Sequence, residues 1–266
     1  MGNPPVHKAR KRFGQNFLND DHVIDKIVKS ISPKPGQHLI EIGPGQGAIT
    51  EPLLEALEGN LDVIELDRDL IPILKAKLFR HEGLQIHEAD ALKFDFASLA
   101  SDGRPLRMVG NLPYNISTPL MFHLLEYSDI VEDMHFMLQK EVVQRLCAAP
   151  GDSAYGRLGI MMQYRCEARY LFTVPPGSFS PPPKVDSAIV RLTPRKELPY
   201  TASNFELFAQ VVKAAFAQRR KTLRNNLKGM IDDAGLEALG INPGIRAEML
   251  GIEAFVNIAN AIDKAA

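Results

Sequence analysis

A carboxamide and an aromatic ring stand close together in the stretch "GNLPYNIST", residues 110–118. Asn111 and Tyr114 are separated only by a leucine and a proline, and proline stiffens the backbone that carries them. An apolar run precedes the stretch and a helix-like run follows it, so we expect both side chains on a loop after a strand. The pair offers a neutral hydrogen-bond acceptor beside a flat ring, which suits a planar base with an exocyclic amine.

A glycine-rich turn, "EIGPGQG", marks a second candidate site directly after another apolar run. Gly43, Gly45 and Gly47 permit a tight turn and a close approach of the backbone to a ligand. The spacing is GxGxG, which differs from the GxGxxG of dinucleotide-binding enzymes. By itself the motif is explained equally well as an ordinary strand-to-helix turn.

Two acids follow the next strands at positions that suit a nucleoside. Glu65 lies 22 residues after Gly43 and can accept both ribose hydroxyls, while Asp90 can accept from an adenine amine. No Lys-Ser/Thr pair for phosphate binding follows the glycines. The combination fits S-adenosylmethionine better than ATP or NAD, although each acid alone is also typical of a polar strand end.

With such a cofactor, the loop of Asn111 predicts methyl transfer to an adenine amine. The lone pair of this amine is delocalised into the ring, and acceptors for its N–H groups favour a pyramidal, nucleophilic nitrogen. The side-chain oxygen of Asn111 and a backbone carbonyl near Leu112 or Pro113 are candidate acceptors, and stacking on Tyr114 contributes roughly 1–3 kcal/mol. No strong base is required, because the alkylated amine is acidic. The alternative for "NLPY" is a strand-to-helix turn without a chemical role.

Alternating strands and helices must position these residues. Apolar runs predict seven strands, at 37–43, 61–67, 84–90, 106–110, 133–139, 167–174 and 185–193. Helical patterns between them predict helices over 19–31, 48–58, 68–80, from 118 onward and over 140–149. The alternation predicts an α/β, Rossmann-like fold with a mostly parallel sheet and the site at the strand ends. Only ten residues, "PPGSFSPPPK", join the last two strands, so these form a terminal antiparallel hairpin.

A break in the pattern divides the chain near residue 195. We expect a cofactor-binding α/β domain over 1–195, whose residues 1–15 are a basic tail. Beyond this boundary no strand pattern remains, and "FELFAQVVKAAFAQRR" predicts a helix over 205–220. We therefore expect residues 196–266 to form a small helical domain.

Opposite charges are segregated along the chain, although its net charge is −1. Residues 41–70 hold eight acids and a single basic residue, whereas residues 1–13 and 210–230 are basic and contain no acid. Two acid-free basic segments indicate a surface for a polyanion, and nucleic acid is the predicted partner. A solvated tail and a solvated helix face are the alternative. The candidate RNA-binding residues are Lys8, Arg10, Lys11, Arg12, Arg220, Lys221 and Arg224.

The composition is ordinary for a globular protein, with 45% hydrophobic and 24% charged residues. No apolar run approaches the ~20 residues of a membrane span, and the N-terminus lacks the apolar core of a secretory signal. Cys147 and Cys166 have no metal-ligand spacing and are predicted to be reduced, so we expect a cytoplasmic protein without a metal. No apolar stripe is left over for self-association, and we expect a monomer.

Eight motifs in a fixed order carry a family resemblance along nearly the whole chain. They are "FGQNFL", "EIGPGQGAIT", "VIELD", "EADAL", "GNLPYNIST", "MLQKEVVQRL", "FSPPPKVDSAIVRL" and "FAQRRKTLRNNL". Together they resemble the ribosomal RNA adenine dimethyltransferases, and among these the bacterial small-subunit enzymes linked to kasugamycin sensitivity. The resemblance implies a methyltransferase fold with a small helical domain. It also implies N6,N6-dimethylation of two adjacent adenosines near the 3′ end of 16S rRNA, as a step of ribosome biogenesis.

The resemblance further implies roles for individual residues. Asn111 and Tyr114 match the binders of the target amine and base, and Phe179 in "FSPPPK" matches a ring on the other face of the adenine. Gly45 of the glycine turn joins the candidate cofactor-binding set. This set comprises Asn16, Leu18, Gly43, Gly45, Glu65, Asp90 and Asn111.

Three other functions share parts of this pattern. The related large-subunit enzymes that confer antibiotic resistance have the same cofactor motifs, but "LQKEVVQRL" and "AQRRKTLRNNL" argue against them. DNA adenine methyltransferases usually have an acid at the position of Asn111. A non-catalytic assembly or transcription factor on this scaffold is a rival of another class, and the intact "NLPY" and glycine motifs favour an enzyme.

Overall fold

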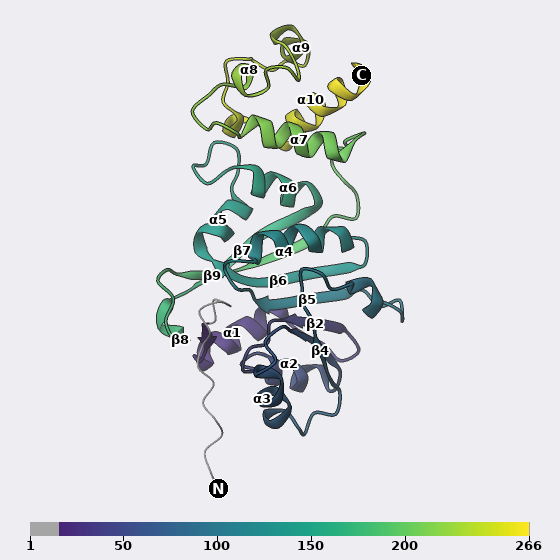
Figure 1. The fold of residues 1–266 in the computed structure, drawn as a ribbon, viewed down its shortest axis with the longest axis vertical. Helices are drawn as coiled ribbons and strands as arrows, with labels where there is room; N and C mark the ends of the chain where they lie inside the picture. Colours follow the sequence, from purple (N-terminus) through teal and green to yellow (C-terminus); the bar gives the residue numbers. More distant parts are fainter. Residues whose placement is uncertain (1–15, 266) are drawn as a thin grey trace. The chain divides into compact units, whose positions relative to one another are not determined.

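The computed structural model describes residues 16–265 of the 266-residue chain. The predicted RNA-binding residues Lys8, Arg10, Lys11 and Arg12 lie outside the described residues. The chain divides into two compact units, whose elements are labelled in Figure 1. The first unit extends to Val143 and includes Glu167–Pro194, and the second comprises Gln144–Cys166 and the chain from Arg195 onward. Within 16–265 no helix is long and apolar enough to cross a membrane.

A seven-stranded sheet forms the centre of the first unit, in the order β4-β3-β2-β5-β6-β9-β7 (Figure 1). Strands β2 to β6 pair in parallel, and β9 runs antiparallel to β6. The predicted mostly parallel sheet with a terminal antiparallel hairpin is confirmed. The strand bounds are β2 His38–Ile42, β3 Leu61–Glu65, β4 Leu84–Glu88, β5 Leu106–Asn111, β6 Val131–Gln139, β7 Cys166–Val174 and β9 Ser187–Pro194.

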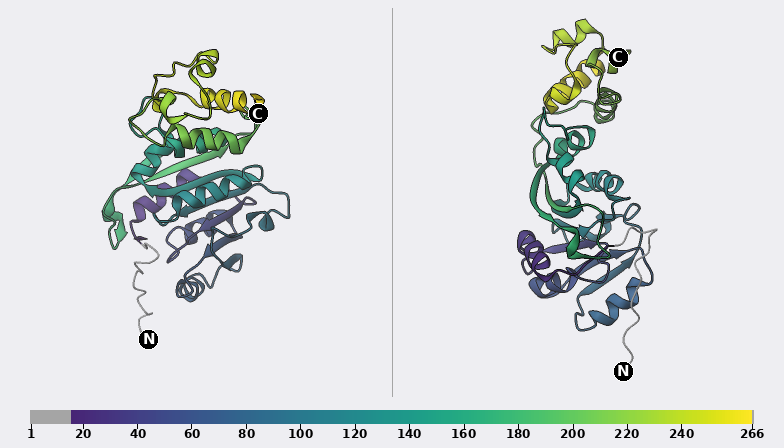
Figure 2. Two further views of the ribbon diagram at one scale, coloured as in Figure 1. Left: turned by 45° about the horizontal axis from the view of Figure 1, so that its top comes forward. Right: turned by 90° about the vertical axis from the view of Figure 1, so that its left-hand side faces the viewer.

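Helices cover both faces of this sheet, as a doubly wound fold requires (Figure 2). Helices α1, α2 and α3 pack on one face against Leu39, Val63 and Val109, and α4 lies on the other face. Short 3₁₀ turns occupy Phe96–Leu99, Leu125–Tyr127 and Pro176–Ser178. The helix bounds are α1 Asp21–Ile31, α2 Thr50–Leu57, α3 Leu70–Lys77, α4 Ser117–Leu124 and α5 Lys140–Cys147.

Helix α1 shows how local sequence and tertiary contacts together define an element. The Asp20 side chain caps its N-terminus by accepting hydrogen bonds from two backbone N–H groups of the first turn. Its apolar residues recur at helical spacing, and two of them, Ile27 and Ile31, are buried in the core. At the C-terminal end, Nη2 of Arg107 in β5 donates to the carbonyl of Ile31 at 2.7 Å. This last contact joins the helix to the sheet.

A small two-stranded sheet brings two distant motifs together. Strand β1 (Phe17–Leu18) pairs antiparallel with β8 (Phe179–Ser180), so that Leu18 faces Phe179 in the register. The backbone N–H of Asn19 donates to the carbonyl of Ser178 at 3.0 Å. Phe17–Leu18 and the start of the "FSPPPK" motif therefore lie side by side in the first unit.

The second unit is largely helical. The predicted division at residue 195 falls where the chain enters this unit for the second time, and 144–166 also belong to it. The sequence analysis instead expects 144–166 in the first domain. The division into domains at residue 195 stays a prediction. The sequence does not predict α6. The helix bounds are α6 Arg157–Arg165, α7 Phe205–Ala215, α8 Leu223–Asn226, α9 Asp233–Ala238 and α10 Ile252–Ala265, with a 3₁₀ turn at Ala247–Met249.

Helix α7 ends at Ala215, so the prediction of a helix over 205–220 is wrong for its last part, residues 216–220. Nδ2 of Asn226 donates to the carbonyls of Ala215 and Gln218 at 2.7 and 3.1 Å. A side chain of α8 thus satisfies carbonyl groups that a continuing helix would have used. Arg220 and Lys221 consequently lie in the turn between α7 and α8.

Candidate active site

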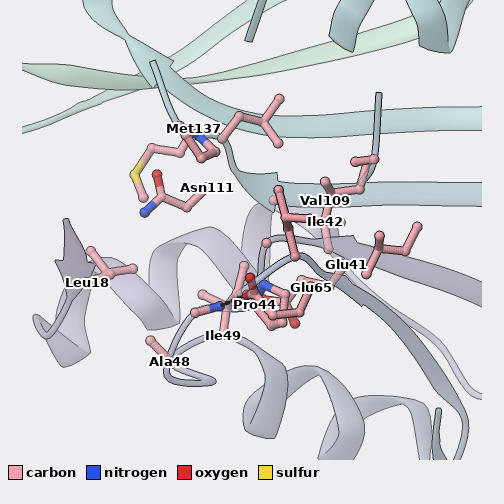
Figure 3. Close-up of a pocket in the computed structure, with 18 of the residues that line it drawn as sticks. Leu18, Glu41, Ile42, Pro44, Ala48, Ile49, Glu65, Val109, Asn111 and Met137 are labelled. Atoms are coloured by element: carbon pink, nitrogen blue, oxygen red, sulfur yellow. Dashed lines mark hydrogen bonds between the residues drawn. The ribbon is translucent and has the colours of Figure 1, made fainter. Parts of the chain in front are cut away.

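A pocket of about 170 Å³ lies at the carboxyl ends of the parallel strands, where open α/β sheets bind their ligands (Figure 3). Residues at or just after the ends of β2, β3, β4 and β5 line it, and so does β1. The structure therefore brings all seven predicted cofactor-binding residues to one cavity. They are Asn16, Leu18, Gly43, Gly45, Glu65, Asp90 and Asn111.

The glycine turn needs glycine for two separate reasons. Gly43, Gly45 and Gly47 have φ angles of 67°, 60° and 76°, in the left-handed region that favours glycine. A Cβ at Gly45 would also lie 3.3 Å from Cδ1 of Phe17, whose ring covers the turn. The backbone of the turn therefore reaches the pocket without a side chain in between.

Glu65 ends β3 as a fixed hydrogen-bond acceptor. Its Oε1 accepts from the backbone N–H of Asp67 at 2.8 Å, and its Oε2 accepts from that of Gly45 at 3.3 Å. Burial raises the pKa of the Glu65 carboxyl, while these two hydrogen bonds lower it. Each carboxylate oxygen can accept more than one hydrogen bond, so capacity remains for ligand hydroxyls.

Asp90 follows β4 and lies at the same edge of the pocket. Its Oδ1 accepts from the backbone N–H of Leu92 at 3.0 Å, and its carbonyl accepts from Lys93 at 2.9 Å. These bonds close a tight turn that holds the carboxylate in place. The predicted neighbourhood of Glu65 and Asp90 is thus present in the structure.

The Asn111 carboxamide is oriented through its nitrogen. Nδ2 donates to the backbone carbonyl of Asn16 at 3.3 Å. Figure 3 shows the side-chain oxygen turned the opposite way, toward Met137. The strand end is fixed as well, because a Cβ at Gly110 would lie only 2.5 Å from the carbonyl oxygen of Ile42. The pocket therefore contains a neutral acceptor, Oδ1, whose position is defined by both the backbone and the amide.

Tyr114 lines the same pocket as Asn111, so the structure unites the pair singled out in the sequence. Its hydroxyl lies 2.8 Å from Oγ of Ser187. Phe179 is placed differently, because its ring is 4% exposed and belongs to the apolar core cluster with Leu18. It is not among the residues that line the pocket. A role for Phe179 as a second stacking ring stays a prediction.

The described basic candidates lie in the second unit. Arg220, Lys221 and Arg224 are all exposed. Arg224 is engaged within the unit, with its Nη2 2.7 Å from Oδ2 of Asp233. Their contact with RNA stays a prediction. Unlike Arg224, neither Arg220 nor Lys221 forms an ion pair with another described residue.

Glu41 is a pocket residue that the sequence analysis does not single out. It lies in β2, is 1% exposed, and its Oε2 has no hydrogen-bond partner among the described residues. Burial, with a smaller contribution from the carboxylate of Glu65, raises the pKa of Glu41 to about 8. The sequence feature that could have indicated Glu41 is that it is the single acid inside the apolar run "QHLIEIG". His135 of β6 also lines the pocket and is 3% exposed.

The sheet order, the reversed strand β9 and the place of the pocket define the class of the protein, a Rossmann-like S-adenosylmethionine-dependent methyltransferase. Two solved structures share the fold over nearly the whole chain. A dimethyladenosine transferase from Plasmodium falciparum is 28% identical, with a TM-score of 0.78 over 91% of this chain and 95% of that chain. The 23S rRNA methyltransferase ErmE is 26% identical, with a TM-score of 0.72 over 93% of this chain and 100% of that chain.

The chain belongs to the ribosomal RNA adenine dimethylase family, whose model matches residues 6–264. "Ribosomal RNA small subunit methyltransferase A" of Marinobacter nauticus is 61% identical over 98% of this chain and 94% of its own length. The protein of the same name from Pseudomonas aeruginosa is 59% identical over 96% of this chain and 95% of its own length. The resemblance carried by the eight motifs is confirmed, and with it the enzyme class and S-adenosylmethionine as the methyl donor.

The chemistry of the pocket fits this cofactor, which carries positive charge on its sulfonium and ammonium groups. The acidic side chains that line the pocket are Glu41, Glu65, Asp67 and Asp90, and among the described residues no Lys or Arg lines it. The buried Oε2 of Glu41 has no hydrogen-bond partner among the described residues and is available to a ligand. This lining, which has acidic groups and no basic side chain in the described part of the chain, therefore suits a cationic nucleoside rather than a phosphate ester.

Proposed function

We propose that the chain dimethylates N6 of two adjacent adenosines near the 3′ end of 16S rRNA, within the small ribosomal subunit or its precursor. Relatives that are named as small-subunit methyltransferases are 54–61% identical over nearly the whole chain. The large-subunit enzyme ErmE is 26% identical. The higher identity supports the small-subunit substrate, and the reaction takes place in the cytoplasm as part of ribosome biogenesis, carried out by a monomer.

Residues at the strand ends hold the cofactor in this proposal. Glu65 accepts the ribose hydroxyls, because its carboxylate is fixed by backbone donors at the end of β3. Asp90 accepts from the adenine amine of the cofactor, and the Gly43–Gly45 turn provides the close backbone approach. Asn16 and Leu18 close the pocket from β1 and the residue before it.

The observation that carries the proposal is the orientation of Asn111. Its Nδ2 donates to the carbonyl of Asn16, and its Oδ1 is turned toward Met137 of the pocket lining (Figure 3), where it can accept from an N–H of the target amine. S-adenosylmethionine supplies a methyl group on a sulfonium centre, which is an electrophile without any activation by the protein. Asn111 therefore has one task, which is to orient the target nitrogen and favour its pyramidal, nucleophilic form.

Tyr114 provides the flat surface for the target base. Its ring and Asn111 line one pocket, so a stacked adenine presents its amine toward the Oδ1 acceptor. Phe179 stacks on the second face in this proposal, a role that requires its ring to leave the core cluster with Leu18 when RNA binds. Such a movement of the Phe179 ring is a distinct prediction of this scheme.

The basic residues bind the phosphates of the rRNA. Arg220, Lys221 and Arg224 are exposed in the second unit, and the basic N-terminal residues Lys8, Arg10, Lys11 and Arg12 supplement them. Phosphate contacts supply affinity without reading sequence, so the choice of target depends on the folded rRNA and on the pocket. The proposal assigns 196–266 the role of a small RNA-binding domain.

Methyl transfer from labelled S-adenosylmethionine into four substrates tests the function. The substrates are unmethylated 30S particles, free 16S rRNA, 23S rRNA and duplex DNA, and 30S particles that already carry the methyl groups are the control. We expect label in unmethylated 30S particles, as N6,N6-dimethyladenosine at two adjacent positions near the 3′ end. Preferential labelling of 23S rRNA or DNA would contradict the proposal, and so would binding to 30S particles without methyl transfer.

A further inference from the structure

A hydrogen bond from a distant strand holds the ring of Tyr114. The hydroxyl of Tyr114 lies 2.8 Å from Oγ of Ser187, which is 73 residues further along the chain. Ser187 is the first residue of β9 and is 1% exposed, so its hydroxyl has no access to bulk water. Burial raises the pKa of Tyr114, and its hydroxyl stays protonated and able to donate at neutral pH.

Ser187 is itself rigidly placed by the strand pairing around it. It is the register partner of Gln139, the last residue of β6. The next residue, Lys140, donates its backbone N–H to the carbonyl of Asp186 at 2.9 Å. Nζ of Lys140 also lies 3.2 Å from Oδ2 of Asp186. The anchor for the Tyr114 hydroxyl is therefore part of the central sheet.

The loop of Tyr114 fixes the backbone but not the tip of the ring. The backbone N–H groups of Ile116 and Ser117 donate to the carbonyl of Pro113 at 3.1 and 3.2 Å. Oγ of Ser117 donates to the carbonyl of Tyr114 at 3.2 Å. These bonds define where the ring begins, whereas its hydroxyl at the far end is held by Ser187. Two attachment points, one at each end, define the direction of the long axis of the ring better than one.

We propose that Ser187 is a positioning residue, which holds the hydroxyl end of Tyr114 and so keeps the long axis of the ring where the target adenine requires it for stacking. The inference rests on the proposed function, because it presupposes that Tyr114 stacks on that base. A ring fixed in advance loses no further rotational freedom when the base arrives. Ser187 acts only through Tyr114 and touches neither the cofactor nor the base in this scheme.

A double-mutant cycle tests the proposal on the full-length protein. Ser187→Ala and Tyr114→Phe each remove one partner of the hydrogen bond and leave the ring in place, and the third variant combines them. The measured quantity is the single-turnover rate of methyl transfer into unmethylated 30S particles at saturating cofactor. We expect each single variant to lose roughly threefold to tenfold in rate, as for one lost hydrogen bond, and the double variant to lose no more than either single variant.

A matched control separates positioning from general loosening of the fold. Ser178 is also 1% exposed, and its hydroxyl donates to Oδ2 of Asp20 at 2.8 Å. Ser178→Ala therefore removes an equally buried serine hydroxyl without touching Tyr114. Its effect should multiply with that of Tyr114→Phe. Affinity for S-adenosylhomocysteine, measured by calorimetry, should be the same in Ser187→Ala and the wild type.

The outcomes separate this proposal from the proposed function. Tyr114→Ala removes the ring and should lower the rate far more than Tyr114→Phe. If Tyr114→Ala keeps the wild-type rate, the stacking role in the proposed function fails. If Tyr114→Ala is slow but Ser187→Ala is as fast as the wild type, only the positioning role fails. Multiplying effects of Ser187→Ala and Tyr114→Phe would also overturn it, because they would show independent actions.

Discussion

At the scale of single residues, the nitrogen and the oxygen of the Asn111 carboxamide have different roles in the proposed function. The nitrogen donates to the carbonyl of Asn16 within the protein, and in the proposed function the oxygen accepts from the target amine. A neutral acceptor suits this position, because a carboxylate would also bind the positive cofactor and stabilise the ground state. In the proposed function Asn111 therefore acts by orienting the target amine, because a carboxamide does not titrate near neutral pH.

Asn111→Ala should lower the single-turnover rate of methyl transfer by roughly 10²–10³, as for the loss of one preorganised polar contact. Tyr114 remains able to stack, and phosphate contacts dominate RNA affinity, so binding to 30S particles should change little. Rates measured at increasing S-adenosylmethionine concentration distinguish two causes. A loss that persists at saturation supports orientation of the amine, whereas recovery at high concentration would make Asn111 only a cofactor-binding residue. A wild-type rate would contradict both.

Sequence reasoning locates some site residues and misses others for a physical reason. Asn111 and Glu65 stand at the ends of predicted strands, and the carboxyl ends of parallel strands meet at one edge of a sheet. The position of Ser187 follows from the pairing of β9 with β6, and the environment of Glu41 follows from its depth of burial. The strand pairing is a property of the assembled sheet that no local pattern encodes. The single acid in the apolar run "QHLIEIG" marks the position of Glu41 but not its depth of burial. The buried position of Phe179 is likewise visible only in three dimensions.

At the scale of elements, Arg107 joins three pieces of the first unit. Its guanidinium forms two hydrogen bonds of 2.8 Å with the carboxylate of Asp133 in β6. It also donates to Oε1 of Gln37 at 2.7 Å and to the carbonyl of Ile31 at the end of α1. The Arg107 and Asp133 side chains are 6% and 13% exposed, so this ion pair is largely removed from water.

Arg107→Ala should lower the free energy of unfolding by about 3–5 kcal/mol, because it leaves the Asp133 carboxylate without its partner in a nearly buried place. Urea titration followed by circular dichroism measures the change. The double variant Arg107→Met with Asp133→Leu is the control, since it leaves no unpaired charge and should regain part of the loss. A change below about 1 kcal/mol in the single variant would show that the pair does not hold these elements together.

The elements themselves follow the sequence to different extents. Strands β2 to β6 and helix α1 have strong periodic patterns, and the structure contains them close to the predicted bounds. The end of α7 depends on Asn226, whose side chain reaches back to Ala215 and Gln218. Helical periodicity continues beyond Ala215 in the sequence, so only this tertiary contact reveals the true end.

At the scale of the whole molecule, charge segregation predicts where RNA affinity comes from. Arg220→Glu with Lys221→Glu reverses two exposed charges in the turn between α7 and α8. Affinity for 30S particles should fall, and the slope of its logarithm against that of salt concentration should decrease by up to about two. Lys264→Glu in α10 is the control for charge reversal elsewhere in the second unit. Unchanged affinity and slope would mean that the turn is only a solvated surface, and cofactor affinity should not change in any variant.

The dependence of the free energy of unfolding on pH is a second property of the whole molecule, and the buried residue Glu41 contributes to it. Burial raises the pKa of Glu41 to about 8 in the folded protein, against 4.5 for an ordinary glutamate. Between these values the folded state holds a proton that the unfolded state has lost. The contribution of Glu41 to the free energy of unfolding is therefore fully present below pH about 4.5, and it falls as the pH rises toward 8, by at most about 1.4 kcal/mol per pH unit.

Glu41→Gln removes this titration while keeping the shape of the protonated acid. We expect the cofactor-free variant to have a flatter stability profile between pH 5 and 8, and to gain most over the wild type at the alkaline end. Urea unfolding at several pH values measures both profiles. Glu65→Gln is the matched control: burial also raises the pKa of Glu65, but its carboxylate accepts two backbone hydrogen bonds, so its contribution to the slope should be smaller. If the stability of Glu41→Gln and of the wild type changed with pH in the same way, Glu41 would ionise normally in the folded protein. Water would then reach its carboxyl group more than its burial implies.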